Sequence, residues 1–291
     1  MIYAIENELI KAEISDMGAE LQSIYNKKRA SEYLWQGNAD YWTGRAYNLF
    51  PICGRLTDGK YTYKGKLYEM GLHGFARNSV FAVEEVNPDR ITFVLRANEA
   101  IKSQYPFDFI FKVCFSLNGS CLKTAYKVTN LSEDDMYFAL GGHPGFNVPL
   151  TDGEKFEDYY LEFDNITDIK QIINTPVFYT GRTESYSLKE GKILPLDHGL
   201  FNEDAIFFTD MSKAVTLKSR CSDASVRVEY PAFRNLGFWH KPQTAAPYVC
   251  IEPWTSVPAT DGVVDNLETK NQMERLKSGE EFSINFNIII K

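Results

Sequence analysis

The chain consists largely of short runs in which apolar and polar residues alternate, and turn sequences join these runs in pairs. In the clearest pair, Asn118-Gly119 connects 107–117 to 121–129. Alternation with a period of two places successive side chains on opposite faces of a strand, and Asn-Gly favours a tight hairpin turn. Strands that fold back directly on their neighbours pair antiparallel. This pattern restricts the chain to folds made of antiparallel hairpins.

The same pattern recurs along the chain, and helical periodicity is almost absent. Further strands and hairpins are predicted at 2–5 with 9–14, at 57–70 around Lys64-Gly65, at 80–86 with 90–96, and at 282–290. The exceptions are one helical turn at 99–104, a polar loop at 180–187, and a short helix after a loop at 255–266. No linker or repeat divides the chain. We therefore expect an all-β protein with one domain over residues 1–291, folded as a large antiparallel β-sandwich of two sheets.

Charge and composition argue against several partners and locations. The formal net charge is −8, whereas nucleic acids and anionic membranes are bound by clustered Lys and Arg. No apolar run approaches the ~20 residues of a membrane helix, and the N-terminal residues do not resemble a signal peptide. The five cysteines are odd in number and include no Cys-x-x-Cys pair. We expect no nucleic-acid or membrane partner and a reduced, cytoplasmic location; the sequence is silent on oligomeric state.

His143 lies in the stretch 140–149, between Gly142 and Pro144. Glycine permits the close approach of a ligand or another backbone, and Pro144 favours extended geometry for the residue before it. We expect this imidazole to be presented from a shaped turn, where it can act as an acid or a base near neutral pH. The alternative is a turn histidine whose glycines serve the turn alone.

His73 has a similar setting, with Gly71 and Gly74 on either side. Two histidines in glycine-flanked loops between strands indicate a shared site better than one does. Zinc ligands usually recur at short fixed spacings, and the four histidines include no His-x-His or His-x-x-x-His pair. We therefore predict no metal site.

Glu252 follows an apolar run at 248–251 and precedes Pro253 and Trp254. We expect Pro253 to end the strand, so that Glu252 lies at the strand end beside an apolar wall. Partial desolvation raises the pKa of a carboxyl group and makes it usable as a general base. The alternative is a strand-end carboxylate that faces solvent.

Arg55 and Asp204 are further candidates because each lies where an irregular segment meets a strand. Arg55 follows Gly54 and could bind a polyhydroxylated or anionic ligand through its fork of donors, although either residue could be an ordinary surface charge. Aromatic residues beside these loops could stack on a sugar; the candidates are Trp35, Tyr41, Trp42, Phe146, Trp239 and Trp254.

Five short motifs together resemble the aldose 1-epimerase (galactose mutarotase) family over nearly the whole chain. In family order they are Gly54-Arg55, Leu72-His73-Gly74, Gly142-His143-Pro144-Gly145-Phe146-Asn147, Glu203-Asp204-Ala205 and Ile251-Glu252-Pro253-Trp254. The nearest branch resembles the LacX-like proteins associated with lactose and tagatose-phosphate utilisation. The resemblance implies a galactose mutarotase-like supersandwich that interconverts the α and β anomers of a small-molecule sugar without a cofactor.

The resemblance also implies a role for each candidate residue. Glu252 takes the position of the base that removes the proton of the anomeric hydroxyl, and His143 that of the acid that protonates the ring oxygen. Arg55, His73 and Asp204 take the positions that bind sugar hydroxyls or the ring oxygen.

The sequence departs from the galactose-specific branch in two loops. His73 is followed by Gly-Phe-Ala-Arg rather than by a second glycine, and the loop at His143 reads His-Pro-Gly-Phe-Asn. His-Gly-Phe-Ala-Arg also resembles the hexose-6-phosphate epimerase relatives, in which arginines hold the phosphate. Arg77, with Arg55 and Lys241 as further cations, is therefore a candidate phosphate ligand. Alternatively, Arg77 pairs with a carboxylate or points into solvent.

Two other classes of function remain possible on such a fold. A carbohydrate-binding protein without turnover is the main alternative, but a protein that only binds sugar needs no paired acid and base such as His143 and Glu252. A polysaccharide lyase or hydrolase is the third possibility. Hydrolysis requires two carboxylates, and the sequence offers one well-placed Glu together with histidines.

Overall fold

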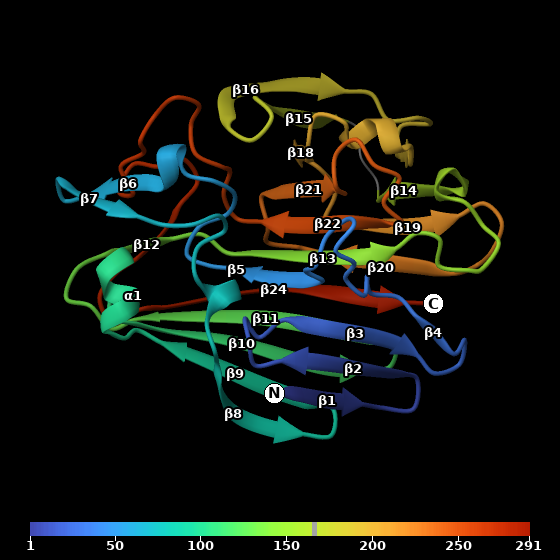
Figure 1. The fold of residues 1–291 in the computed structure, drawn as a ribbon, viewed down its shortest axis with the longest axis horizontal. Helices are drawn as coiled ribbons and strands as arrows, with labels where there is room; N and C mark the ends of the chain where they lie inside the picture. The colour runs from blue at the N-terminus through green and yellow to red at the C-terminus, as the bar shows by residue number, and fades with distance from the viewer. Residues whose placement is uncertain (165–167) are drawn as a thin grey trace.

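The computed structural model describes residues 1–164 and 168–291, and its strands form two large antiparallel sheets (Figure 1). Strands account for 51% of the residues and helices for 7%, which confirms the all-β prediction. The nine-stranded sheet consists, in spatial order, of β17 (Ile193–Pro195), β14 (Tyr159–Phe163), β19 (Ala214–Ser219), β20 (Ser225–Glu229), β24 (Glu281–Ile290), β11 (Cys121–Asn130), β10 (Phe109–Asn118), β9 (Arg90–Arg96) and β8 (Ala82–Asn87). The seven-stranded sheet consists of β16 (Tyr179–Tyr186), β15 (Ile169–Asn174), β18 (Ile206–Thr209), β21 (Asn235–Trp239), β22 (Tyr248–Trp254), β13 (Gly141–Asn147) and β5 (Ala46–Leu49).

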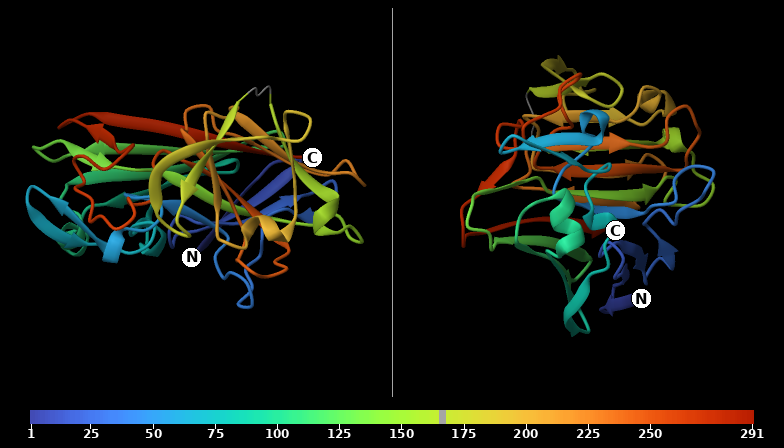
Figure 2. Two further views of the ribbon diagram at one scale, coloured as in Figure 1. Left: turned by 90° about the horizontal axis from the view of Figure 1, so that it is seen from above. Right: turned by 60° about the vertical axis from the view of Figure 1, so that its left-hand side comes forward.

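Smaller elements flank the two large sheets (Figure 2). A four-stranded sheet contains β1 (Ile2–Glu6), β2 (Ile10–Ser15), β3 (Leu21–Asn26) and β4 (Ser31–Glu32). Two-stranded ladders are formed by β6 (Lys60–Tyr63) with β7 (Lys66–Glu69) and by β12 (Met136–Phe138) with β23 (Glu274–Leu276). The α-helix α1 spans Glu99–Gln104, as predicted, and begins where the Asn98 side chain accepts a hydrogen bond from the Ile101 N–H.

The predicted hairpins are confirmed, with a shift of one residue at the clearest turn. Asn118 is the last paired residue of β10, opposite Cys121, so the two-residue turn is Gly119-Ser120. Gly119 adopts a φ of 58° there, which glycine tolerates without strain.

Two local predictions were wrong. Residues 180–187 do not form a polar loop, because Tyr179–Tyr186 is strand β16. This strand lies at the edge of its sheet and is mostly exposed on both faces. Its sequence therefore lacks the alternation of apolar and polar residues that would have revealed a strand. No helix follows residue 266; the segment forms turns, and the Lys270 ammonium group donates to the carbonyls of Val257 and Pro258 instead.

The core between the sheets fixes one face of the seven-stranded sheet and leaves the other face for a site. On β22, Val249 and Ile251 belong to the main hydrophobic core, whereas Tyr248, Cys250 and Trp254 pack in separate clusters. Side chains alternate between the faces of a strand, so Glu252 shares its face with this second set. Residues of β22 can therefore be buried on both sides of the sheet.

The chain after β5 is anchored on the same core. The Phe50 ring stacks on Phe111 of β10, with the ring centroids 4.6 Å apart, and both rings are fully buried. Phe50 thereby holds the start of the irregular segment that leads to Arg55.

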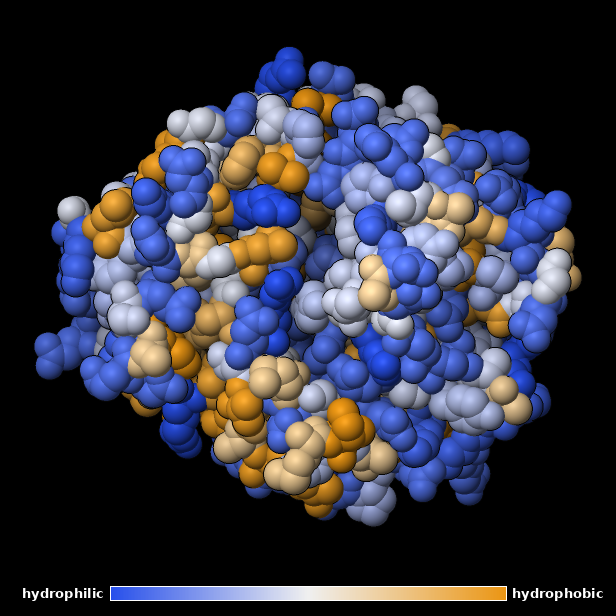
Figure 3. Space-filling model, viewed as in Figure 1, coloured by the Kyte–Doolittle hydropathy of each residue, from blue (hydrophilic) through white to orange (hydrophobic). Residues whose placement is uncertain are grey.

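The exposed face in Figure 3 is mainly hydrophilic, and its apolar residues lie in separate groups. Among the described residues, no helix is both long and apolar enough to span a membrane.

Candidate functional site

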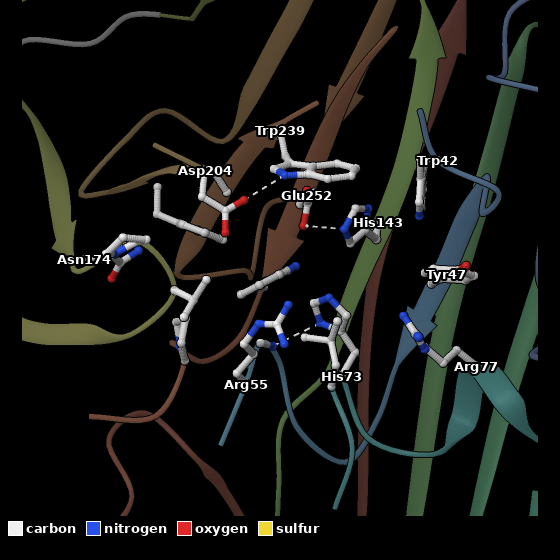
Figure 4. A pocket seen from close by; sticks show the side chains of 18 of the residues that line it. Trp42, Tyr47, Arg55, His73, Arg77, His143, Asn174, Asp204, Trp239 and Glu252 are labelled. Atoms are coloured by element: carbon white, nitrogen blue, oxygen red, sulfur yellow. Dashed lines mark hydrogen bonds and ion pairs between the residues drawn. The ribbon is translucent and has the colours of Figure 1, made fainter. Parts of the chain in front are cut away.

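The seven-stranded sheet carries a cavity of about 360 Å³, and it is lined by the two predicted catalytic residues and the four main predicted substrate ligands. They are Arg55, His73, Arg77, His143, Asp204 and Glu252. Figure 4 shows His143 and Glu252 facing each other, with Asp204 and Trp239 on one side and Tyr47 and Arg77 on the other. Five segments separated by up to about two hundred residues of sequence thus converge on one space.

His143 and Glu252 lie opposite each other on the neighbouring strands β13 and β22. Gly141 pairs with Trp254 and Gly145 with Cys250. This register places His143 directly across from Glu252. The His143 Nε2 atom lies 3.4 Å from Glu252 Oε2. The two side chains therefore present a proton acceptor and a proton donor side by side at the cavity wall.

Both residues lie within strands, which corrects two predictions. His143 is in β13 rather than in a turn, and Pro253 does not end β22, because it pairs with Leu236 and the strand continues to Trp254. The pairing of β13 with β22 is interrupted between Gly141 and Gly145, and this interruption accommodates residues that lack an N–H. Pro144 and Pro253 both lie beside it.

The pair is almost completely buried, and burial shifts the two pKa values in opposite directions. Glu252 is 1% exposed and His143 7% exposed. Burial, and then the negative charge of Asp204, raise the pKa of Glu252 well above its usual value. Burial, together with the nearby Arg77, lowers the pKa of His143 to about 3. Between these two pKa values, the pair holds a single proton.

This burial predicts that Glu252→Gln stabilises the fold at neutral pH. The raised pKa means that folding opposes ionisation of Glu252, which costs stability above the unfolded-state pKa near 4.5. Glutamine keeps the shape without that cost. The melting temperature of Glu252→Gln should exceed that of the wild type at pH 7, and the difference should shrink as the pH falls towards 4.5. A lower melting temperature at pH 7 would contradict the assigned pKa shift.

His73 is held in one tautomer by the neighbouring backbone. Its Nδ1 accepts a hydrogen bond from the Gly54 N–H at 3.0 Å, and the backbone N–H of His73 donates to the Gly54 carbonyl at 2.9 Å. Burial lowers the pKa of His73 well below its usual value, so the ring is neutral and its proton lies on Nε2. His73 can therefore donate one hydrogen bond to a ligand oxygen.

Asp204 and Trp239 form a hydrogen-bonded pair at the other side of the cavity. The Trp239 Nε1–H donates to Asp204 Oδ1 at 2.8 Å, and burial raises the pKa of Asp204. The backbone of Asp204 has a φ of 128°, and that of His73 a φ of 62°. Positive φ values in residues other than glycine are strained and are often found at functional sites.

Arg77 faces the cavity from the short 3₁₀ turn Ala76–Asn78. Its guanidinium lies over the Tyr47 ring, 4.6 Å from the centroid. Within residues 1–164 and 168–291, neither Arg77 nor Arg55 has a carboxylate within 4.0 Å. The prediction that Lys241 is a third cation at the site was wrong. Its Nζ donates to the Asp40 carbonyl, and the residue does not line the cavity.

The aromatic residues divide between the cavity and the core. Trp42, Trp239 and Trp254 line the cavity, whereas Phe146 is fully buried in the main core. Tyr47 also lines the cavity and was missed; it lies on β5 and carries no sequence signal beyond alternation.

Sequence reasoning also missed a possible ligand set for a metal ion. Donor atoms of His143, Cys250 and Glu252 all lie within 4.8 Å of one another. Cys250 and Glu252 are two residues apart on one strand, so they share a face, and this spacing was a usable signal. The third ligand comes from β13, where no short motif could reveal it.

Comparisons with known proteins indicate the family of the chain. The family model for aldose 1-epimerase matches residues 1–283. The chain is 36% identical over 287 residues to the chromosomal protein LacX of Lactococcus lactis, covering 95% of each chain. It is 27% identical over 185 residues, or 60% of its length and 58% of the other protein, to a Salmonella typhimurium protein named "Putative glucose-6-phosphate 1-epimerase".

Solved structures show the same fold. A galactose mutarotase related enzyme from Lactobacillus acidophilus superposes with a TM-score of 0.96 at 36% identity, covering 100% of this chain and 97% of that one. A galactose mutarotase-like protein from Lactobacillus casei superposes with a TM-score of 0.95 at 31% identity, covering 100% of both chains. The expected galactose mutarotase-like architecture is thereby confirmed.

Proposed function

The chain belongs to the aldose 1-epimerase family, and from this we propose that it interconverts the α and β anomers of an aldose by opening and reclosing the sugar ring. The observation that carries the proposal is the buried pair of Glu252 and His143, with Nε2 and Oε2 3.4 Å apart on a cavity wall. Ring opening requires an acid and a base in the same site, because one sugar oxygen loses a proton while another gains one.

In the proposed reaction, the shared proton lies on His143 and Glu252 is ionised. Sugar hydroxyls that donate to the carboxylate favour this arrangement. Glu252 accepts the proton of the anomeric hydroxyl, the bond between C1 and the ring oxygen breaks, and His143 protonates that oxygen. Rotation about C1–C2 presents the other face of the aldehyde, and the reverse transfers close the ring. Each transfer step returns the pair to one proton.

The remaining residues bind and orient the sugar. His73 is a neutral donor through Nε2–H, because its Nδ1 accepts from Gly54, and it is assigned a sugar hydroxyl or the ring oxygen. Asp204 accepts from hydroxyls while Trp239 holds one of its oxygens. Arg55 supplies further donors from the cavity rim. The free cysteines are consistent with a reduced, cytoplasmic setting for this reaction.

Polarimetry tests the proposal. Freshly dissolved α-glucose or α-galactose should reach its equilibrium rotation faster with the protein than in matched buffer alone. If neither sugar nor its 6-phosphate is accelerated, the isomerase assignment fails, and the carbohydrate-binding alternative on the same fold becomes the better account.

A phosphorylated aldose is the second candidate substrate, and Arg77 favours it. Its guanidinium faces the cavity without a carboxylate partner among the described residues, and its Nε is buried without a hydrogen-bond partner. A phosphate would supply acceptors for these donors. The Salmonella relative carries a sugar phosphate in its name.

Arg77→Ala tests this substrate. Hydrogen bonds to charged groups contribute roughly 1.5–3 kcal/mol each, so kcat/KM for glucose 6-phosphate or galactose 6-phosphate should fall by about 10–100-fold. The free sugars should change much less. Arg220→Ala is a matched control, because its guanidinium also covers a tyrosine ring, that of Tyr160 at 5.0 Å, but outside the cavity. Equal effects of Arg77→Ala on free and phosphorylated sugars would favour the free aldose.

A further inference from the structure

Cys250 lies directly beside the proposed acid–base pair. It precedes Glu252 by two residues on β22 and projects from the same face. The thiol is free and fully buried. Opposite it on β13 is Gly145, where a Cβ atom would lie 3.4 Å from the Cys250 sulfur. The same Cβ would lie 3.0 Å from the Trp42 ring and 3.3 Å from the Trp35 Cβ, so the glycine lets tryptophan side chains pack closely beside the thiol.

The polar atoms of the pair are incompletely satisfied. Glu252 Oε1 and His143 Nδ1 are buried without hydrogen-bond partners in the part of the chain that the structure describes, although such atoms usually have one. The 3.4 Å between His143 Nε2 and Glu252 Oε2 is longer than a typical hydrogen bond. It does match two neighbouring ligands of a tetrahedral zinc ion, which bond lengths of about 2.0–2.2 Å place roughly 3.3–3.6 Å apart.

We propose that His143, Cys250 and Glu252 bind a thiophilic divalent cation, with Zn²⁺ as the physiological type, and that the bound ion blocks the acid–base pair. All three donor atoms lie within 4.8 Å of one another, so small side-chain rotations bring them onto one ion. Two of the three ligand residues, His143 and Glu252, line the cavity, so a water molecule or a ligand in the cavity would complete the coordination.

The charges balance at this site. A neutral imidazole, a thiolate and a carboxylate together carry two negative charges, which a divalent cation neutralises in a buried setting. Binding releases the thiol proton and any proton held by the pair to solvent. A thiolate ligand selects Zn²⁺ over Mg²⁺ or Ca²⁺, which prefer oxygen ligands.

Direct binding is tested with Co²⁺ as a spectroscopic probe. Titration of the metal-free protein with Co²⁺ should give a near-ultraviolet thiolate-to-cobalt band and the strong visible bands of tetrahedral cobalt, and Zn²⁺ should abolish both. Cys250→Ala and Cys250→Ser should remove the near-ultraviolet band and weaken binding by at least about 10–100-fold. Cys53→Ala, which removes the other buried cysteine, should leave the spectrum unchanged. No such band in the wild type, or an undiminished band in both Cys250 variants, would overturn the proposal.

The inhibition is measured separately on anomer exchange. Zn²⁺ should inhibit the wild type reversibly, with recovery on addition of EDTA, and the Cys250 variants should keep the metal-free rate while resisting Zn²⁺. Unchanged wild-type activity with Zn²⁺ bound would refute the blocking role. The absorption titration requires no turnover, so failure of the anomerase proposal and failure of the metal site are distinguishable.

Discussion

Glu252→Gln should lower the rate of anomer interconversion by about 10²–10⁴-fold, the range typical of one general acid or base. The amide keeps the size of the side chain but cannot accept the proton of the anomeric hydroxyl. Glu252 is 1% exposed, so bulk water has little access to replace it. The loss should appear mainly in kcat, because the sugar contacts from Arg55, His73 and Asp204 remain.

His143→Asn should cause a loss of similar size, because the amide cannot protonate the ring oxygen. The double variant should be scarcely slower than either single one, since groups that act as a unit are not additive. His198→Asn is the matched control: His198 contacts His240 at 3.0 Å and lies outside the cavity. Near-normal activity in a folded Glu252→Gln or His143→Asn variant would disprove the acid–base assignment.

Gly74→Ala should destabilise the protein by roughly 2–6 kcal/mol, combining backbone strain with a steric clash. Gly74 has a φ of +76°, and a Cβ atom there would lie 2.3 Å from the Phe50 carbonyl oxygen. That carbonyl accepts from the N–H groups of Phe75 and Ala76, so it cannot move away without breaking the docking of this loop. The same shift would displace His73, and sugar turnover should fall as well.

Gly71→Ala in the same loop is the control that shows whether the loss of stability is specific to Gly74 or follows from any glycine-to-alanine substitution in this loop. No atom lies within 4 Å of a Cβ at Gly71, and its φ is not in the positive region. Denaturant unfolding should therefore place Gly71→Ala within about 0.5 kcal/mol of the wild type. Similar stabilities for the Gly71 and Gly74 variants would contradict the described contact with Phe50.

Local sequence signals predicted the hairpins well because each depends on a few adjacent residues. The turn after Asn118 was misplaced by one residue, and β16 was missed because an exposed edge strand has little apolar alternation. The environments of His143 and Glu252 were misjudged for a different reason. The local sequence suggests a turn at Gly142-His143-Pro144 and a strand end at Pro253, whereas an interruption between two strands accommodates both prolines.

The candidate site was predicted as a set of residues but not as a geometry. Family motifs identified six of the residues that line the cavity. The tautomers of these residues, their pKa shifts and the opposition of His143 to Glu252 follow from strand register and burial. The His73 tautomer depends on Gly54, nineteen residues away along the chain. Tyr47 was overlooked because its proximity to the site arises from sheet pairing, which no short motif encodes. Cys250 was overlooked although its spacing of two residues from Glu252 on one strand was a usable signal.

NMR magnetisation exchange between anomers at equilibrium tests most directly whether Glu252 and His143 catalyse anomer interconversion or only bind the sugar. Glucose, galactose and their 6-phosphates would each be measured with the wild type and with the double variant Glu252→Gln/His143→Asn. We expect rapid α-to-β exchange for at least one sugar with the wild type and only the spontaneous rate with the double variant. Ligand-induced shifts that report binding, with exchange no faster than in buffer for all four sugars, would contradict this expectation.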